Sequence, residues 1–341
     1  MTDSLHEKYS RQMLFRGIGP HGQQRLLASR VVIIGCGAIG AATANLLVRA
    51  GVGQVRLIDR DFVEPSNLQR QTLFEESDAR DSLPKALAAQ RKLRAINSDI
   101  QVEGFVADLN PSNATELLSG FPLILDGTDN FETRFLINDF AVSSGTPWIY
   151  AAAVSSYGVS LTIRPGHSAC LACLLDSSWG IGFEDTCETI GILGPAVNLI
   201  ASLQSTEAIK FLSGQEESCH GRLLSCDVWS GRFQSIVPPR NPQCRACARR
   251  DFSYLAGQAQ PHITLCGRDS VQIHERHREL DLPALERHLG ATVRDLRQNG
   301  FLLRFRVPPY EMTVFPDGRA IIKGTTDPAV ARSLYAKYLG A

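Results

Sequence analysis

Three glycines near the N-terminus have the spacing of a phosphate-binding loop. Residues 31–40 read VVIIGCGAIG, so that Gly35, Gly37 and Gly40 follow an apolar run as GxGxxG. Gly35 permits a tight turn, Gly37 lets a phosphate approach the backbone, and Gly40 lets the following helix pack closely. The N-terminus of that helix favours an anion. We therefore expect a nucleotide phosphate at this loop, while glycines used only for packing are the simpler alternative.

Three charged side chains further along indicate which nucleotide this is. Asp59 ends the next predicted strand about 20 residues on, where a carboxylate can bind ribose hydroxyls. With the glycines alone, this fits a nicotinamide dinucleotide equally well. Arg70 and Lys85 follow on the side where the nucleotide is expected, and a triphosphate that releases pyrophosphate needs such cations. They favour ATP, although a solvated surface charge is the simplest interpretation of either one alone.

Two aspartates follow the fourth predicted strand in the segment LILDGTDN (123–130). Asp126 and Asp129 lie at the carboxyl edge of the sheet, where one carboxylate can hold Mg²⁺ against phosphate oxygens. The alternative for Asp129 is a helix N-cap.

Four of the nine cysteines form two CxxC pairs. Cys170 and Cys173 stand in CLAC, and Cys244 and Cys247 in CRAC. Each pair suits half of a tetrahedral Zn²⁺ site. Because seventy residues separate the pairs, the metal would join distant parts of the domain and be structural. Redox disulfides or free thiols are the alternative.

The elements that position these residues alternate between short β-branched runs and helical patterns. We predict a Rossmann-like α/β fold with a mostly parallel sheet and helices on both faces. Helices are expected to begin near Ala38, Pro84, Pro111 and Asn130, the two prolines lying in first turns. The expected strands are 31–34, 55–58, 100–106, 123–125, 148–151, 157–166 and 221–228. A further helix is expected at 195–212, and the weakly periodic segment 174–193 is typical of a functional loop.

The last part of the chain reads as a separate small α+β unit. We predict an ATP-binding domain with the zinc site over residues 1–251 and an accessory domain over 252–341. The accessory domain should contain a helix at 282–289, strands at 301–306, 310–315 and 320–323, and a closing helix. Asp327 can cap that last helix, with Pro328 in its first turn and Gly340 at its end.

Composition excludes some partners. The 341 residues suggest about two domains at roughly 150 residues each. Thirty-five basic residues balance thirty-five acidic ones, so no overall charge draws the chain to nucleic acid or an anionic membrane. We find no signal peptide in residues 1–13 and expect a cytoplasmic protein with reduced thiols.

The motifs together resemble the ThiF/MoeB family of sulfur-carrier-protein adenylyltransferases, which are related to ubiquitin-activating enzymes. The likeness rests on YSRQMLF (9–15), the glycine loop, SNLQRQ (66–71), LPK (83–85), DGTDN (126–130) and the CxxC pairs, and spans about residues 9–250. It implies that ATP and the Gly-Gly carboxylate of a ubiquitin-like carrier form an acyl adenylate and pyrophosphate. The C-terminal extension favours the thiamin branch with a ThiS-like carrier, and a MoaD-like carrier of the molybdopterin pathway is possible. It also implies a homodimer and, as a possible sulfur donor, a cysteine desulfurase.

The resemblance also implies roles for individual residues. Asp59 would bind ribose, Asp129 would serve Mg²⁺, and Arg11 would reach the nucleotide of a neighbouring subunit. Asn67, Arg70 and Lys85 would bind the phosphates. The other residues implied to contact the nucleotide are Gly35, Gly37, Ala38, Gly40, Ser66, Leu68, Gln69 and Asn130. Ala38 replaces the glycine usual in the family, and its N–H remains usable if φ stays negative.

Cys187, in EDTCETIG, matches a family cysteine that can take the activated carrier. Its acidic neighbours disfavour a thiolate, so a catalytic role and a dispensable one both stay open. Cys36, Cys219, Cys226 and Cys266 are expected to be buried or incidental.

Two other functions compete with adenylation. A nicotinamide-dependent dehydrogenase is supported by the glycines and Asp59 only. A nucleotide-bound scaffold would recruit a carrier without activating it.

Overall fold

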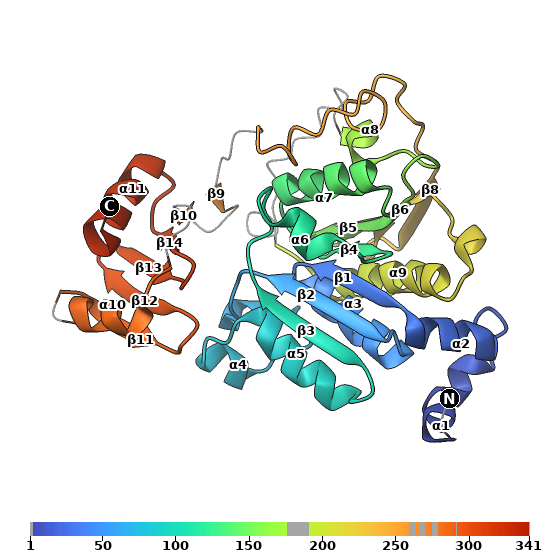
Figure 1. Cartoon of the computed structure of the whole chain (residues 1–341), viewed down its shortest axis with the longest axis horizontal. Coiled ribbons are helices and arrows are strands. Elements are labelled where there is room, and N and C mark those ends of the chain that lie inside the picture. Colours follow the sequence, from blue (N-terminus) through green and yellow to red (C-terminus); the bar gives the residue numbers. More distant parts are fainter. Residues whose placement is uncertain are drawn as a thin grey trace. The chain divides into compact units, whose positions relative to one another are not determined.

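A computed structural model describes residues 3–175, 191–258, 264–265, 270–274, 279–290 and 292–340. These residues form two compact units, the first comprising 3–175 and 191–258 and the second beginning at 264 (Figure 1). Among the described helices, none has both the length and the apolar composition needed to cross a bilayer.

The first unit is built on one eight-stranded sheet with the order β3-β2-β1-β4-β5-β6-β7-β8. Its first five strands are parallel and its last three join antiparallel. The strands are β1 Arg30–Ile34, β2 Gln54–Asp59, β3 Gln101–Val106, β4 Ile124–Asp126, β5 Trp148–Val154, β6 Tyr157–Ile163, β7 Leu223–Asp227 and β8 Arg232–Ile236. The predicted mostly parallel Rossmann-like sheet is confirmed.

Helices cover both faces of this sheet (Figure 1). Alternation along β1 explains why, since Val31 and Ile33 enter one core cluster and Val32 and Ile34 the other. The helical segments of this unit are α1 Asp3–Met13, α2 Gly19–Ala28, α3 Ala38–Ala50, η1 Pro65–Asn67, α4 Glu76–Arg80, α5 Lys85–Ile96, α6 Ala114–Leu118, α7 Phe131–Ser144, α8 Leu171–Leu175, α9 Gly194–Leu212 and η2 Glu216–Ser218.

Both prolines expected in first helical turns lie outside their helices. Pro84 is the residue before α5, and α6 begins only at Ala114, with Asn113 before it. Pro111 itself lies in the turn that precedes α6. A fixed proline φ suits such turns as well as a helix start, so the residue type alone could not separate the two.

The second unit is a six-stranded sheet with the order β11-β12-β13-β14-β10-β9, antiparallel throughout. Its elements are β9 Thr264–Leu265, β10 Ser270–His274, α10 Leu282–Leu289, β11 Arg294–Gln298, β12 Leu303–Val307, β13 Tyr310–Val314, β14 Arg319–Lys323 and α11 Pro328–Leu339. Its core includes Phe305, Met312 and Tyr335. As expected, Asp327 caps α11 by accepting a hydrogen bond from Ala329 N.

Candidate functional site

The glycine loop joins β1 to α3, and backbone crowding explains two of its glycines. Gly35 has φ +83°, and a Cβ there would lie 2.6 Å from the carbonyl oxygen of Gly127. A Cβ on Gly40 would lie 1.8 Å from the carbonyl oxygen of Gly35. Any side chain at either position would push apart the loop, α3 and the end of β4.

Gly37 is different because the protein itself leaves room there. The nearest atom to an added Cβ would be Nε2 of Gln71, 3.8 Å away. The first hydrogen bond of the helix runs from Ala41 N to Gly37 O, so the N–H groups of Ala38, Ile39 and Gly40 have no acceptor within the helix. Ala38 begins α3 and has no positive φ. Its N–H can therefore donate to a phosphate as the glycine usual in the family would. The arrangement is that of an anion-binding helix N-terminus.

Asp59 ties the end of β2 to this loop. Its carboxylate accepts hydrogen bonds of 2.6 Å from the backbone N–H groups of Cys36 and Asp61. Burial raises the pKa of Asp59, while the nearby Lys85 ammonium opposes that rise. Lys85, with only 4% of its surface exposed, lies 3.2 Å from Asp61 Oδ2. A buried ammonium held between two carboxylates beside the loop is therefore part of the structure.

The segment 66–71 contributes polar groups of several kinds. Asn67 is buried, and its Oδ1 accepts a hydrogen bond from Glu64 N in a capping box around η1. Arg70 is half-buried and donates to the carbonyl of Ser66 at 2.9 Å. Gln71 is 4% exposed, and its Oε1 has no hydrogen-bond partner among the described residues. Leu68 packs on the core and Gln69 is exposed.

The two aspartates at the end of β4 and just after it have separate positions. Asp126 is fully buried and pairs with Arg134, its Oδ2 lying 3.1 Å from Nε. Asp129 is exposed on the following turn, close enough to Arg60 and Arg134 to raise their pKa values. Asn130, not Asp129, is the N-cap of α7, because its side chain accepts from Thr133 N. The N-cap interpretation of Asp129 is therefore wrong.

Arg11 is exposed on α1, far from the loop of its own chain. Gln12 anchors α1 by donating to Ala50 O, the last residue of α3. The loop is at the other end of this helix, and 13 residues correspond to about 20 Å. The structure does not bring Arg11 to the loop within one chain.

The four cysteines of the CxxC pairs converge. Their sulfurs all lie within 4.8 Å of one another, with Cys170–Cys173 at 3.8 Å, Cys170–Cys244 at 3.6 Å and Cys173–Cys247 at 3.4 Å. Ligands about 2.3 Å from a tetrahedral Zn²⁺ are about 3.8 Å apart, so the donor set fits this metal. Cys187 lies outside the described residues.

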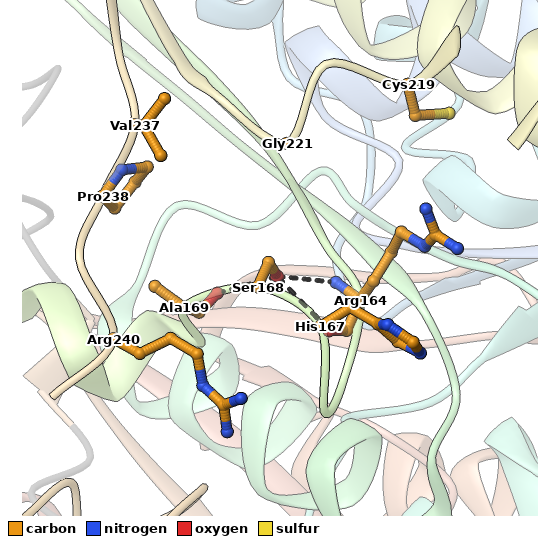
Figure 2. Close-up of a pocket in the computed structure, with 9 residues that line it drawn as sticks. All are labelled: Arg164, His167, Ser168, Ala169, Cys219, Gly221, Val237, Pro238 and Arg240. Carbon is orange, nitrogen blue, oxygen red and sulfur yellow. Dashed lines mark hydrogen bonds between the residues drawn. The ribbon is translucent and has the colours of Figure 1, made fainter. Parts of the chain in front are cut away.

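A pocket of about 200 Å³ lies elsewhere on the first unit, and Figure 2 shows the residues that line it. Its lining includes Arg164, His167 and Arg240. Arg164 follows β6, whose last residue Ile163 pairs with Trp148 at the start of β5. Since the glycine loop lies at the carboxyl ends of the parallel strands, this pocket is not the nucleotide site.

Similarity to known proteins identifies the family. The sequence model described as the ThiF family matches residues 9–246 of this chain. Sulfur carrier protein ThiS adenylyltransferase of Bacillus subtilis strain 168 is 45% identical over 98% of this chain and 99% of its own length. The chain belongs to the ThiF family.

Other relatives are similar over a smaller share of the chain. Sulfur carrier protein adenylyltransferase of Thermus thermophilus is 37% identical over 71% of this chain and 90% of its own. SAMP-activating enzyme E1 of Haloferax volcanii is 36% identical over 71% of this chain and 88% of its own. A crystal structure of E. coli MccB with ATP has a TM-score of 0.62 and 26% identity, over 70% of this chain and 74% of that one.

Four residues at this ThiF-family site were missed as candidates from the sequence. Arg60 and Asp61 follow the ribose-binding candidate directly, and Gln71 ends the SNLQRQ motif. Arg134 lies eight residues after its partner Asp126. Only Gln71 had a local signal, its place in the motif, since the other contacts depend on the folded chain.

Proposed function

We propose that this chain catalyses ATP-dependent adenylation of the C-terminal Gly-Gly carboxylate of a ubiquitin-like sulfur-carrier protein, releasing pyrophosphate. The observation that carries the proposal is the buried Lys85 close to Cys36 in the glycine loop that precedes α3. A dinucleotide has less need of such a cation than a triphosphate that loses pyrophosphate. The relative aligned along nearly the whole chain is named for ThiS, which favours a ThiS-like carrier and thiamin biosynthesis over a MoaD-like carrier and molybdopterin biosynthesis.

The chemistry asks for alignment and charge neutralisation. A carboxylate is ionised at neutral pH, so its attack on the α-phosphate needs no general base. In the proposed complex, the amides of Ala38 and Gly40 and the side chains of Asn67, Arg70 and Lys85 hold the phosphates. Asp59 and the neighbouring Asp61 face the ribose. Pyrophosphate then leaves with its charge neutralised by Lys85 and Arg70.

Two metals complete the proposal. Asp129, rather than the paired and buried Asp126, offers an exposed carboxylate for Mg²⁺. When bound, Mg²⁺ neutralises phosphate charge and orients the leaving group. The four-cysteine cluster holds a structural Zn²⁺, which joins the segment after β6 to the segment after β8 and takes no part in the reaction.

We also infer that the active form is a homodimer. Arg11 is exposed together with Leu14 and Phe15, which are 73% and 65% exposed. An exposed apolar pair beside a cation suits a contact with a second copy. Arg11 would then reach the partner's nucleotide, which it cannot do in its own chain.

The carrier requires a surface as well as a reactive carboxylate. Phe233 on β8, the last strand of its sheet, is 66% exposed, and Trp229 in the turn before β8 is 83% exposed. Apolar side chains on an edge strand suit a protein partner, and we propose that the carrier rests there. A cysteine desulfurase would supply sulfur to the activated carrier. A covalent role for Cys187 remains a prediction.

Carrier-dependent exchange of labelled pyrophosphate into ATP tests the function. With Mg²⁺ and a ThiS-like carrier ending in Gly-Gly, we expect exchange, and truncation of the two glycines should abolish it. Arg70→Ala and Lys85→Ala should each lower the exchange rate by about a hundredfold, whereas Arg49→Ala, an exposed arginine on α3, should not. Unchanged pathway function in both variants would favour a scaffold, and tight NADH binding without ATP binding would favour a dehydrogenase.

A further inference from the structure

The second unit exposes one strongly basic sheet face. It consists of Arg294 and Arg297 on β11, Arg304 and Arg306 on β12, and Lys323 on β14, which we call the basic face. The other face of these strands packs on α10 and α11 through residues such as Phe305 and Leu339. Arg294, Arg297 and Lys323 are exposed, and the Arg306 side chain is 60% exposed.

Strand register sets arginine opposite arginine on this face. Arg294 pairs with Arg306, and Arg297 pairs with Arg304. Like charges directly opposite each other across two strands destabilise the pairing. Two such pairs side by side are therefore not explained by the stability of the sheet.

A β-bulge is what brings the second pair together. The register shifts between Arg294 and Arg297, so that Arg297 stands opposite Arg304 while Leu296 packs on the core. Asp295, inside the bulge, has φ +52°, a conformation that costs a non-glycine residue energy. Both the bulge and the like-charge pairs oppose stability, and both gather guanidinium groups on one face. Local features that conflict with stability mark functional sites.

Carboxylates neutralise only part of this charge. Glu311 on β13 accepts hydrogen bonds from Arg304 and Arg306, and Asp295 lies 3.7 Å from Arg306. Arg294, Arg297 and Lys323 form no ion pair with a carboxylate of the described residues. Because the whole chain is neutral, the attraction of this face for an anion is local.

The anion that fits best is a protein surface. Guanidinium groups bind carboxylates in a planar, two-bond geometry. Single-stranded nucleic acid would require aromatic side chains for stacking, and the strand positions of this face carry none.

We propose that the basic face binds an acidic surface of the sulfur-carrier protein, an inference that rests on the proposed function. The alignment with the ThiS-named Bacillus relative covers 98% of this chain and so includes this unit. A relative named for the carrier ThiS therefore shares the unit that contains the basic face.

The test uses full-length protein and a ThiS-like carrier. Direct binding is measured by calorimetry at low and high salt, and carrier KM and kcat are measured by pyrophosphate exchange. The variant Arg294→Glu with Arg297→Glu changes the basic face, and Arg287→Glu with Arg332→Glu changes exposed arginines on α10 and α11 by the same charge. A third variant, Arg294→Gln with Arg297→Gln, removes the like-charge pairs without adding acid.

We expect the basic-face charge reversal to weaken carrier binding and to raise the carrier KM by about tenfold. Its kcat at saturating carrier should not change. The control variant should bind the carrier with the same salt dependence as the wild type. The glutamine variant should bind the carrier more weakly yet unfold at the same or a higher temperature, which separates binding from folding. Equal carrier affinity in the wild type and both basic-face variants would overturn the inference, even if the wild type is fully active. The inference would also be overturned if the wild type bound an RNA duplex, the basic-face variants did not, and all three proteins had the same carrier affinity. If exchange fails in the wild type but carrier binding still depends on Arg294 and Arg297, the proposed adenylation is wrong and the basic face stands.

Discussion

The backbone N–H of Cys36 donates a hydrogen bond of 2.6 Å to the carboxylate of Asp59. It links the turn of the glycine loop to the end of the neighbouring strand. The residue expected to bind the ribose thus also holds the loop expected to bind the phosphates. The two halves of the nucleotide site are therefore built as one unit.

Replacing Asp59 should damage both folding and binding. In Asp59→Asn the amide NH₂ group faces one of the two backbone N–H donors, which leaves a buried donor unpaired at a cost of about 1–3 kcal/mol. We expect a lower unfolding temperature and at least about a tenfold weaker affinity for a non-hydrolysable ATP analogue, measured by calorimetry. Asp81→Asn, on an exposed aspartate, is the control. Unaltered nucleotide affinity in Asp59→Asn would argue against its role.

The glycines of the loop should separate structure from binding. Gly40→Ala places a Cβ 1.8 Å from the Gly35 carbonyl oxygen, so this variant should be strongly destabilised. In Gly37→Ala the added Cβ meets no atom nearer than 3.8 Å, and φ is negative. This variant should therefore unfold at the wild-type temperature but bind ATP more weakly than the wild type. Thermal unfolding and nucleotide titration of both variants check this. A Gly37→Ala protein with full ATP affinity would show that the phosphates lie elsewhere.

Metal content tests the cysteine cluster. We expect one zinc per chain by elemental analysis and its loss in Cys244→Ser. The loss should lower the unfolding temperature, by about 2–4 °C for each kcal/mol of stability removed. Cys226→Ser changes another buried cysteine and should keep the zinc. If the wild type purifies without zinc under anaerobic conditions, and adding zinc does not raise its unfolding temperature, the site is not a zinc site.

Glu311 should make the second unit sensitive to acid. Burial alone would raise the pKa of Glu311, but hydrogen bonds and charge from Arg304 and Arg306 hold it below 4.5. A lowered pKa means that the carboxylate stabilises the fold above about pH 4.5 and ceases to do so as the pH falls through the folded-state pKa. Glu311→Gln should therefore lose about 1 kcal/mol at pH 7 and differ little from the wild type in acid.

Hydrogen-exchange protection of β12 and β13, corrected for intrinsic rates, measures this difference. Glu286→Gln on α10 is the matched control. A Glu311→Gln effect that is the same at neutral and acidic pH would exclude the electrostatic explanation.

How far the sequence could predict the fold depends on burial. The central parallel strand β1 was found because both of its faces are buried from Val31 to Ile34, and such a strand is apolar throughout. In contrast, β8 was missed because all five of its residues are exposed, so no alternation marks it. Asn130 and Asp129 are adjacent and both can cap a helix, and only the backbone decides between them. The pairs Lys85–Asp61 and Arg134–Asp126 depend on the fold and have no local signal.

The four sulfurs join positions 74 residues apart, with α9, β7 and β8 between them. If a metal closes this link, the stretch becomes a ring in the topology of the chain. A protease that cut once inside the ring would leave the two fragments joined by the metal as well as by the pairing of β6 with β7, and a chelator would remove the first of these links. The outer end of the sheet would thus be held by a connection that is reversible and can be removed without breaking a peptide bond.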